Sequence, residues 1–271
     1  MTNNTQLPVV VTGVASGIGA AAGRLLADRG LPVVGIDRSV PESFAGTFVR
    51  ADLSTPAGAH GAARSVLDAA PDGLAGLANI AGVPGTAPWR TVLGVNVFGL
   101  RELTAALVPA IREGGCVVNL SSAVAGAWER NLPAVRAFAL AADTEAALDA
   151  VARDESVTGH SYRFSKECVR YLTEHLAAEY LPRRVRVTSV SPGPVATPIL
   201  DDFKRDHGVA KVEGAGALLG RFGEPADIAG VVAFLLSDSA AWINGTDIRV
   251  DGGLTAHRTV QEASEAATPT D

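Results

Sequence analysis

Tyr162 and Lys166 are the residues whose types and spacing point most directly to chemistry. They are four residues apart within an uninterrupted helical pattern, so both side chains lie on one face of a helix. A tyrosine hydroxyl titrates near about pH 10, and a neighbouring ammonium favours the phenolate and lowers that pKa. The pair could therefore act as a general acid and base. The same spacing also occurs by chance on many helices, so the elements around the pair must decide.

The composition is typical of one globular domain that binds small molecules. The 271 residues are 47% hydrophobic and 19% charged, carry a net charge of -6, and contain no linker-like segment. Their arginines are scattered, which argues against a surface for nucleic acid or for a membrane. Cys116 and Cys168 are expected to be buried thiols, and no metal site is expected. The first residues lack the parts of a signal peptide, so a cytoplasmic location is expected.

A strand, a glycine turn and a helix follow one another at the start of the chain. The apolar run Leu7-Pro-Val-Val-Val-Thr12 ends at Gly13-Val-Ala-Ser-Gly17-Ile-Gly19, and a helical pattern continues to Arg29. Glycine lets the turn approach a phosphate while amides at the helix start receive the negative charge. The next strand ends in Asp37, which can accept hydrogen bonds from an adenine ribose and would repel a 2′-phosphate. This favours NAD over NADP, although the neighbouring Arg38 could bind a phosphate.

Two further strands lead into the same region of the predicted sheet. A strand near Phe48 to Ala51 is followed by Asp52-Leu53, where Asp52 could bond an adenine amino group or serve as a turn carboxylate. The run Leu74 to Gly82 is almost wholly apolar, as in strands that are buried on both faces of a parallel sheet. Because it also ends in glycine, a cofactor would lie across that end.

Polar residues in the next two elements are candidates for the chemistry. Asn96 lies inside an apolar helix expected over Trp89 to Arg112, where it either bonds buried groups or faces a cleft. Ser121 and Ser122 follow a strand that begins at Gly115. In an open α/β sheet, ligands bind at the carboxyl ends of the strands.

The last third of the chain adds two strands and two segments without a clear core face. Strands are expected over Val185 to Val190 and Thr246 to Val250, with a helix over Pro225 to Leu236 between them. Residues 197–220 have poor periodicity and are expected to form a mobile substrate flap. Residues 256–271 have little to bury and are expected to be a flexible tail, so the catalytic domain would span 1–255.

These motifs, in this order, resemble the single-domain short-chain dehydrogenase/reductase family from about Pro8 to Gly253. Ile80 departs from the family pattern, which usually has a second asparagine there, and this concerns sheet packing more than chemistry. The resemblance implies an α/β fold with a Rossmann-type doubly wound parallel sheet of seven strands in the order 3-2-1-4-5-6-7. The matching residues are Thr12-Gly13-Val-Ala-Ser-Gly17-Ile-Gly19, Asp37, Asp52-Leu53, Asn79-Ile-Ala81-Gly82, Asn96, Asn119-Leu-Ser-Ser122, Tyr162-x-x-x-Lys166 and Pro192-Gly193 through Thr197.

The resemblance also implies a role for each catalytic residue. Tyr162 would take a proton from an alcohol or return it to a carbonyl, while Lys166 would lower its pKa and bond the nicotinamide ribose. Ser122, rather than Ser121, would hold the substrate oxygen. Asn96 would fix a water that links Lys166 to solvent. The cofactor would be bound by Gly13, Ser16, Gly17, Ile18, Gly19, Asp37, Arg38, Asp52, Leu53, Asn79, Ala81, Gly82, Tyr162, Lys166, Pro192, Gly193, Val195 and Thr197.

The interval between Ser122 and Tyr162 is longer than the family usually has, because of an insertion over about residues 127–156. Apolar residues at helical spacing within it predict two short helices. A long insertion here resembles the bacterial 3α-hydroxysteroid dehydrogenase/carbonyl reductases. Since the Tyr162 helix normally forms one tetramer interface of the family, an insertion lying over it favours a homodimer through the C-terminal helix and last strand.

The resemblance implies an NAD-dependent alcohol dehydrogenase or carbonyl reductase. Its substrate would be a small molecule, a hydrophobic and cyclic secondary alcohol or ketone similar to a 3α-hydroxysteroid. An aryl or allylic alcohol of the coniferyl type is the alternative on the same scaffold. A protein that senses a nucleotide without catalysis is a third hypothesis, disfavoured because the serine, tyrosine and lysine are all present.

Overall fold

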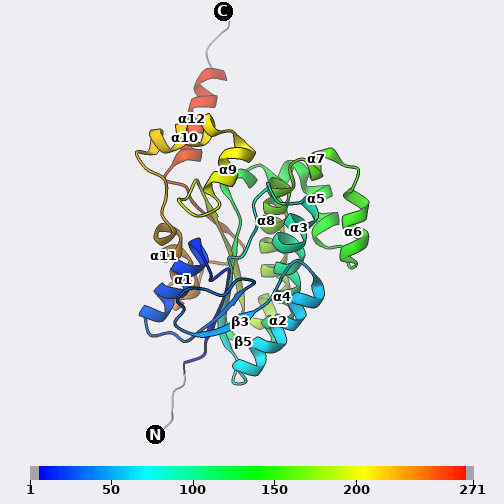
Figure 1. The fold of residues 1–271 in the computed structure, drawn as a ribbon, viewed down its shortest axis with the longest axis vertical. Helices are drawn as coiled ribbons and strands as arrows, with labels where there is room; N and C mark the ends of the chain where they lie inside the picture. Colours follow the sequence, from blue (N-terminus) through cyan, green and yellow to red (C-terminus); the bar gives the residue numbers. More distant parts are fainter. Residues whose placement is uncertain (1–5, 267–271) are drawn as a thin grey trace, which may run out of the picture.

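A seven-stranded parallel sheet forms the centre of the molecule, with strand order β3-β2-β1-β4-β5-β6-β7 (Figure 1). The computed structural model describes residues 6–266. The order confirms the prediction, and it reverses direction between β1 and β4, where an open α/β sheet leaves a crevice for ligands. The strands are β1 (Val9–Thr12), β2 (Val33–Asp37), β3 (Thr47–Arg50), β4 (Leu74–Asn79), β5 (Ile111–Leu120), β6 (Arg186–Pro192) and β7 (Asp247–Val250).

Helices cover both faces of the sheet and divide the core into two clusters (Figure 1). On one face lie α1 (Gly17–Asp28) and α11 (Pro225–Leu236). On the other lie α2 (Pro56–Ala69), the long helix from Trp89 to Ala110, and α8 (Ser161–Glu179). The strands in the middle are buried on both faces, which is why their sequences are continuous runs of apolar residues.

Local signals fix the starts of two of these helices. The side chain of Thr55 accepts a hydrogen bond from Gly58 N at 3.2 Å, and Pro56 takes the first position of α2. In α11, Glu224 and Asp227 form a reciprocal capping box around Pro225. Because these signals are local, the sequence predicts the bounds of α11 correctly.

The helix from Trp89 to Ala110 is irregular at its centre. It consists of α3 (Trp89–Leu93), the π-helical turn η1 (Gly94–Gly99), α4 (Leu100–Leu107) and the 3-10 turn η2 (Val108–Ala110). Among the residues described, it is the one helix long and apolar enough to cross a membrane, but 67% of its apolar window is buried inside the fold. It is a core helix, and Pro109 helps to end it before the predicted limit at Arg112.

The expected insertion before the Tyr162 helix is helical. It comprises η3 (Ala123–Ala125), η4 (Trp128–Asn131), α5 (Leu132–Ala139), α6 (Thr144–Val151) and α7 (Glu155–Thr158). Helix α5 packs against α8, and α6 is tied to α3 because Arg90 pairs with Glu145 and Asp149. The insertion therefore covers one side of α8, as Figure 1 shows.

Two C-terminal segments are more regular than the sequence suggests. The flap contains α9 (Leu200–His207) and α10 (Val209–Leu219), which lie above the sheet together with α12 (Leu254–Ala266) (Figure 1). Helix α12 replaces the flexible tail expected from residue 256. Its start is fixed because Leu254 is buried and the Asp251 carboxylate accepts from Gly253 N and Thr255 N. Residues 267–271 lie outside the described part of the chain. Two 3-10 turns, η5 (Leu181–Arg183) and η6 (Asp238–Ala240), complete the fold.

Candidate functional site

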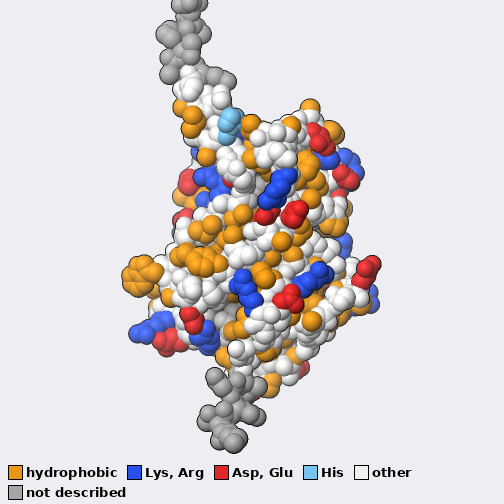
Figure 2. Space-filling view, turned by 90° about the vertical axis from the view of Figure 1, so that its left-hand side faces the viewer, with side chains coloured by type: hydrophobic (Ala, Val, Ile, Leu, Met, Phe, Trp, Pro, Cys, Tyr) orange, Lys and Arg blue, Asp and Glu red, His pale blue; other side chains and the backbone are white. Residues whose placement is uncertain are grey.

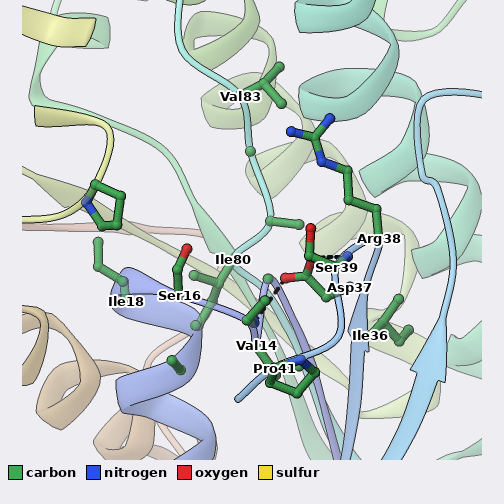
Figure 3. A pocket seen from close by; sticks show the side chains of 18 of the residues that line it. Val14, Ser16, Ile18, Ile36, Asp37, Arg38, Ser39, Pro41, Ile80 and Val83 are labelled. Atoms are coloured by element: carbon green, nitrogen blue, oxygen red, sulfur yellow. Dashed lines mark hydrogen bonds between the residues drawn. The ribbon is translucent and has the colours of Figure 1, made fainter. Parts of the chain in front are cut away.

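A cleft of about 800 Å³ opens at the carboxyl ends of β1, β2 and β4, where the strand order reverses (Figure 3). The glycine turn after β1 forms one wall. A Cβ on Gly19 would lie 2.1 Å from the carbonyl oxygen of Gly13, so no larger residue fits there. Gly17 has a φ of +54°, and a Cβ there would lie 3.3 Å from Thr197 Cγ2 at the start of the flap. The turn therefore leaves its backbone open toward the cleft, as a phosphate would require.

Asp37 lies at the far end of this cleft, at the tip of β2. Its carboxylate accepts hydrogen bonds from Ala15 N and Ser39 N, each at 2.9 Å (Figure 3). These two amides hold the carboxylate between the glycine turn and the loop after β2. Arg38 lines the same cleft, so both signs of charge meet the region where an adenine ribose would lie.

Most of the residues predicted to bind the cofactor line this cleft. Sequence reasoning missed Arg24 and the loop 39–43, which also line it; the loop has no motif, although it directly follows Asp37. Pro192, Gly193 and Val195 are not among the lining residues, and Gly193 packs against Asp251 instead. Tyr162 and Lys166, which were predicted to bind the cofactor as well, are not among them either. The predicted residues that line the cleft are Gly13, Ser16, Gly17, Ile18, Gly19, Asp37, Arg38, Asp52, Leu53, Ala81, Gly82 and Thr197.

Asn79 has a structural position rather than a place in the cleft. It is 3% exposed, and its amide donates to Thr104 Oγ1 and Asn119 Oδ1, each at 2.9 Å. These bonds join β4 to β5 and to α4 beneath the crevice. The family motif that predicts a cofactor contact for Asn79 continues to Ala81 and Gly82, which do line the cleft.

Tyr162 and Lys166 lie on the first turns of α8, next to the end of β5. Ser122 hydrogen-bonds the Tyr162 hydroxyl. Lys166 Nζ lies 5.5 Å from the centroid of the Tyr162 ring and donates to Leu120 O at 2.8 Å. Ser121 Oγ donates to Lys166 O at 3.0 Å. Of the paired hydroxyls, Ser122 thus faces the phenol, whereas Ser121 ties α8 to β5.

Burial dominates the electrostatics of this pair. It lowers the pKa of Lys166 from 10.5 to about 8. It also raises the pKa of Tyr162 above the ordinary value, an effect that the Ser122 bond reduces and the charge of Asp206 reinforces. The expected lowering of the tyrosine pKa by Lys166 is therefore absent in the protein alone. The phenol is protonated at neutral pH, which is the form that can give a proton to a carbonyl.

Asn96 lies in the π-helical turn and bonds buried groups, which is the first of the two alternatives left open by the sequence. Its amide donates to Val83 O and to Ser165 Oγ at 3.1 Å each, and its Oδ1 accepts from Val83 N at 2.9 Å. It is 1% exposed and lies behind Gly82, since a Cβ on Gly82 would lie 3.2 Å from Asn96 Oδ1 and 3.5 Å from Lys166 Nζ. A π-turn is a frequent feature of functional sites. A water held between Asn96 and Lys166 remains a prediction.

The flap helix α9 lies against Tyr162, which the sequence did not indicate. Phe203 meets the ring of Tyr162 edge to face with centroids 4.9 Å apart. Thr86 Oγ1 donates to Asp202 Oδ1 at 2.6 Å, which joins α9 to the loop after β4. Phe203 is one aromatic ring in a charged segment, and that is the signal that could have singled it out. Among the described residues, no group of three or more His, Cys, Asp or Glu side chains could hold a metal ion.

Comparison with known proteins decides the family. The model for short chain dehydrogenases matches residues 8–134, and one described as enoyl-(acyl carrier protein) reductase matches residues 146–255. A coniferyl-alcohol dehydrogenase of Pseudomonas sp. (strain HR199) is 36% identical over 251 residues, which cover 92% of this chain and 97% of that protein. The chain belongs to the short-chain dehydrogenase/reductase family.

Two further members of the family that are similar to this chain are named as 3-alpha-hydroxysteroid dehydrogenases. A 3-alpha-hydroxysteroid dehydrogenase/carbonyl reductase of Comamonas testosteroni is 34% identical over 259 residues, covering 92% of this chain and 96% of its own. The crystal structure of the 3-alpha-hydroxysteroid dehydrogenase from Pseudomonas sp. B-0831, complexed with NADH, is similar with a TM-score of 0.83 at 35% identity. The match covers 94% of this chain and 99% of the chain in that crystal structure. The protein is thus an oxidoreductase of a family that uses nicotinamide cofactors and has members acting on alcohols.

Proposed function

We propose that this enzyme transfers a hydride between NAD(H) and a hydrophobic, cyclic secondary alcohol or its ketone, as a 3α-hydroxysteroid dehydrogenase does. The observation that carries the proposal is the Ser122–Tyr162 hydrogen bond beside Lys166. Lys166 Nζ donates to the carbonyl of Leu120, and Leu120 lines the cleft whose outer end holds Asp37. The proposed reacting groups therefore adjoin the cofactor cleft at the carboxyl edge of the sheet.

The cleft fits a dinucleotide on the evidence of its own shape and charge. Its glycine turn has no room for side chains on the backbone that would meet the pyrophosphate. At the other end, the Asp37 carboxylate would accept hydrogen bonds from the ribose and repel a 2′-phosphate. Arg38 could instead bind the 2′-phosphate and so favour NADP. We expect kcat/KM for NAD to exceed that for NADP, and Asp37→Ala to reduce the ratio, measured with one alcohol at fixed pH.

Each side chain around Tyr162 would have its own role in the reaction. The bound nicotinamide supplies or accepts the hydride. Ser122 would hold the substrate oxygen beside the Tyr162 hydroxyl, which would donate a proton to a carbonyl or accept one from an alcohol. Lys166 would bond the cofactor ribose, and its positive charge would favour the phenolate after the proton has left. Asn96 holds the loop at Val83 against α8 and so fixes the floor of the site.

The choice of substrate rests on the walls around Tyr162 and on the relatives. Phe203 gives the site an apolar cover that suits a ring system. Two relatives that act on 3α-hydroxysteroids support the steroid-like substrate. The coniferyl-alcohol dehydrogenase, at 36% identity, favours a second candidate, an aryl or allylic alcohol. A cytoplasmic location belongs to the same proposal, and fractionation of cells that express the chain tests it.

The decisive experiment measures NADH formation with 3α-hydroxysteroids, other cyclic secondary alcohols and coniferyl alcohol. Tyr162→Phe should lower kcat by about 10²- to 10⁴-fold, the usual contribution of a general acid or base. It should still bind NADH, because the hydroxyl alone is removed. Equal activity of wild type and variant would refute the role of Tyr162. Tight NADH binding without turnover of any alcohol would favour the nucleotide-sensing hypothesis instead.

A further inference from the structure

Phe138, on helix α5 of the insertion, lies between two aromatic rings that belong to the catalytic elements. Its ring centroid is 4.9 Å from that of Phe98 and 5.3 Å from that of Phe164. The three side chains are 1%, 4% and 3% exposed for Phe98, Phe138 and Phe164, so they form a dry contact. Tilted and edge-to-face rings at these separations attract one another and resist sliding.

The two outer rings are direct neighbours of the catalytic set. Phe98 is two residues after Asn96 in the π-helical turn, and Phe164 lies between Tyr162 and Ser165 on α8. The same two elements are joined once more by the Asn96 Nδ2 to Ser165 Oγ bond at 3.1 Å, and Ser165 Oγ donates to Tyr162 O at 2.7 Å. The Asn96–Ser165 hydrogen bond and the Phe138 ring therefore fix the π-turn against α8 at two separate points.

The end of α5 that carries Phe138 is itself held in place by Arg101. Arg101, on α4 just beyond the π-turn, donates to Ala139 O at 2.9 Å and to Ala141 O at 2.6 Å. Ala139 directly follows Phe138 and is the last residue of α5, where a cation is favourable, and Ala141 lies two residues beyond the helix. Arg101 also lies over the ring of Phe98, with Cζ 5.0 Å from the centroid. The insertion thus contacts the π-turn through both an aromatic ring and a fixed charge.

We infer that Phe138 is a positioning residue for the catalytic site: its ring sets the spacing between the π-turn that carries Asn96 and the helix that carries Tyr162 and Lys166. The inference rests on the proposed function. A π-turn has poorer internal hydrogen bonding than an α-helix and depends on its surroundings to persist. Because hydride and proton transfer require reacting atoms close to their final geometry, a small shift of either element lowers the rate of the chemical step.

The test compares Phe138→Leu with Val135→Ala. Val135 is a matched control because it is fully buried on the same helix, but its neighbour on α8 is Cys168, beyond Lys166. Both variants should lower the melting temperature. Only Phe138→Leu should lower kcat, by about tenfold or more, while the Kd for NADH changes less than about twofold, because the cofactor cleft does not include this ring. Equal kcat values for the two variants would overturn the inference.

A second measurement does not depend on turnover. Hydrogen–deuterium exchange of residues 94–99 should accelerate by about tenfold in Phe138→Leu and remain unchanged in Val135→Ala, because only the first releases the π-turn. Equal exchange in both variants would overturn the positioning role. If wild type oxidises no alcohol, the proposed function fails, and the exchange measurement still decides whether Phe138 holds the turn.

Discussion

Lys166 is a nearly buried cation whose ammonium donates to a backbone carbonyl, that of Leu120. Its burial disfavours the charged form and lowers its pKa to about 8. The protein therefore holds Lys166 at the expense of stability, as residues of catalytic sites often are held. The same burial raises the pKa of Tyr162 and keeps it protonated. A shift of that pKa toward neutrality would therefore need charge from the bound cofactor or substrate.

The pKa of Lys166 predicts a stability difference that changes with pH. Because the folded-state value of about 8 lies below the ordinary 10.5, the unfolded chain binds more protons between these values, and stability rises with pH across that window. Below it, a cost of about 3 kcal/mol persists. The free energy of unfolding of Lys166→Met minus that of wild type should thus fall by about 3 kcal/mol from pH 7.5 to 10.5. Urea titrations measure it.

The exposed Lys211 provides the control for that experiment. Lys211→Met removes the same charge from the exposed surface of α10, so it shows the effect of losing a lysine without a change in burial. A pH dependence no larger for Lys166→Met than for Lys211→Met would contradict the buried-cation account.

At the scale of elements, the flap and the loop after β4 meet beside Tyr162. Helix α9 lies over Tyr162 through Phe203, and the bond between Thr86 and Asp202 fixes it to that loop. A ring-shaped substrate that reaches Ser122 must either displace the Phe203 ring or pack against it. The flap is thus the element expected to select among hydrophobic alcohols, whereas the cofactor end of the cleft is fixed by β1 and β2.

Phe203→Ala should lower kcat/KM for a cyclic alcohol by about tenfold, because an apolar contact to a substrate contributes about 1–3 kcal/mol. The Kd for NADH should change little, since Phe203 does not line the cofactor cleft. Steady-state kinetics and fluorescence titration measure the two quantities. Leu218→Ala, at a half-exposed site on α10 of the same flap, should leave both near wild type. Equal losses in the two variants would remove Phe203 from the substrate site.

At the scale of the whole molecule, one face combines apolar side chains with the free edge of the sheet. Figure 2 shows apolar side chains gathered across the face on which α1 and α11 lie, with charged ones around them. Trp242, between η6 and β7, is 99% exposed, and Phe234 on α11 is 42% exposed. On the other side, the insertion covers part of α8. We propose that this α11–β7 face forms a homodimer.

Trp242→Glu should convert the homodimer to a monomer, because a buried charge at the interface would lack a partner. Size-exclusion chromatography with light scattering at micromolar concentration measures the mass. Leu181→Glu is the control, since Leu181 is 62% exposed in η5 and belongs to neither α11 nor β7. A dimeric Trp242→Glu protein, or a monomeric wild type, would contradict this assembly.

The sheet order was implied by the resemblance to the family. The residues by themselves determined the individual strands, the glycine turn, the Tyr162–Lys166 pair and the helical character of the insertion. These features are local: strand runs, glycine spacing, caps and helical periodicity are set by residues close to one another in the chain.

The tertiary structure decided what depends on neighbours from distant segments. It turned Asn96 into part of a π-turn bonded to Val83 and Ser165, and it placed Asn79 between strands. Burial, rather than the adjacent ammonium, set the direction of the Tyr162 pKa. Phe203 reached Tyr162 from a flap, and Phe138 reached Phe98 and Phe164 from an insertion, and neither segment shows a motif. Spacing along the chain cannot predict such contacts, because desolvation and packing depend on which surfaces meet after folding.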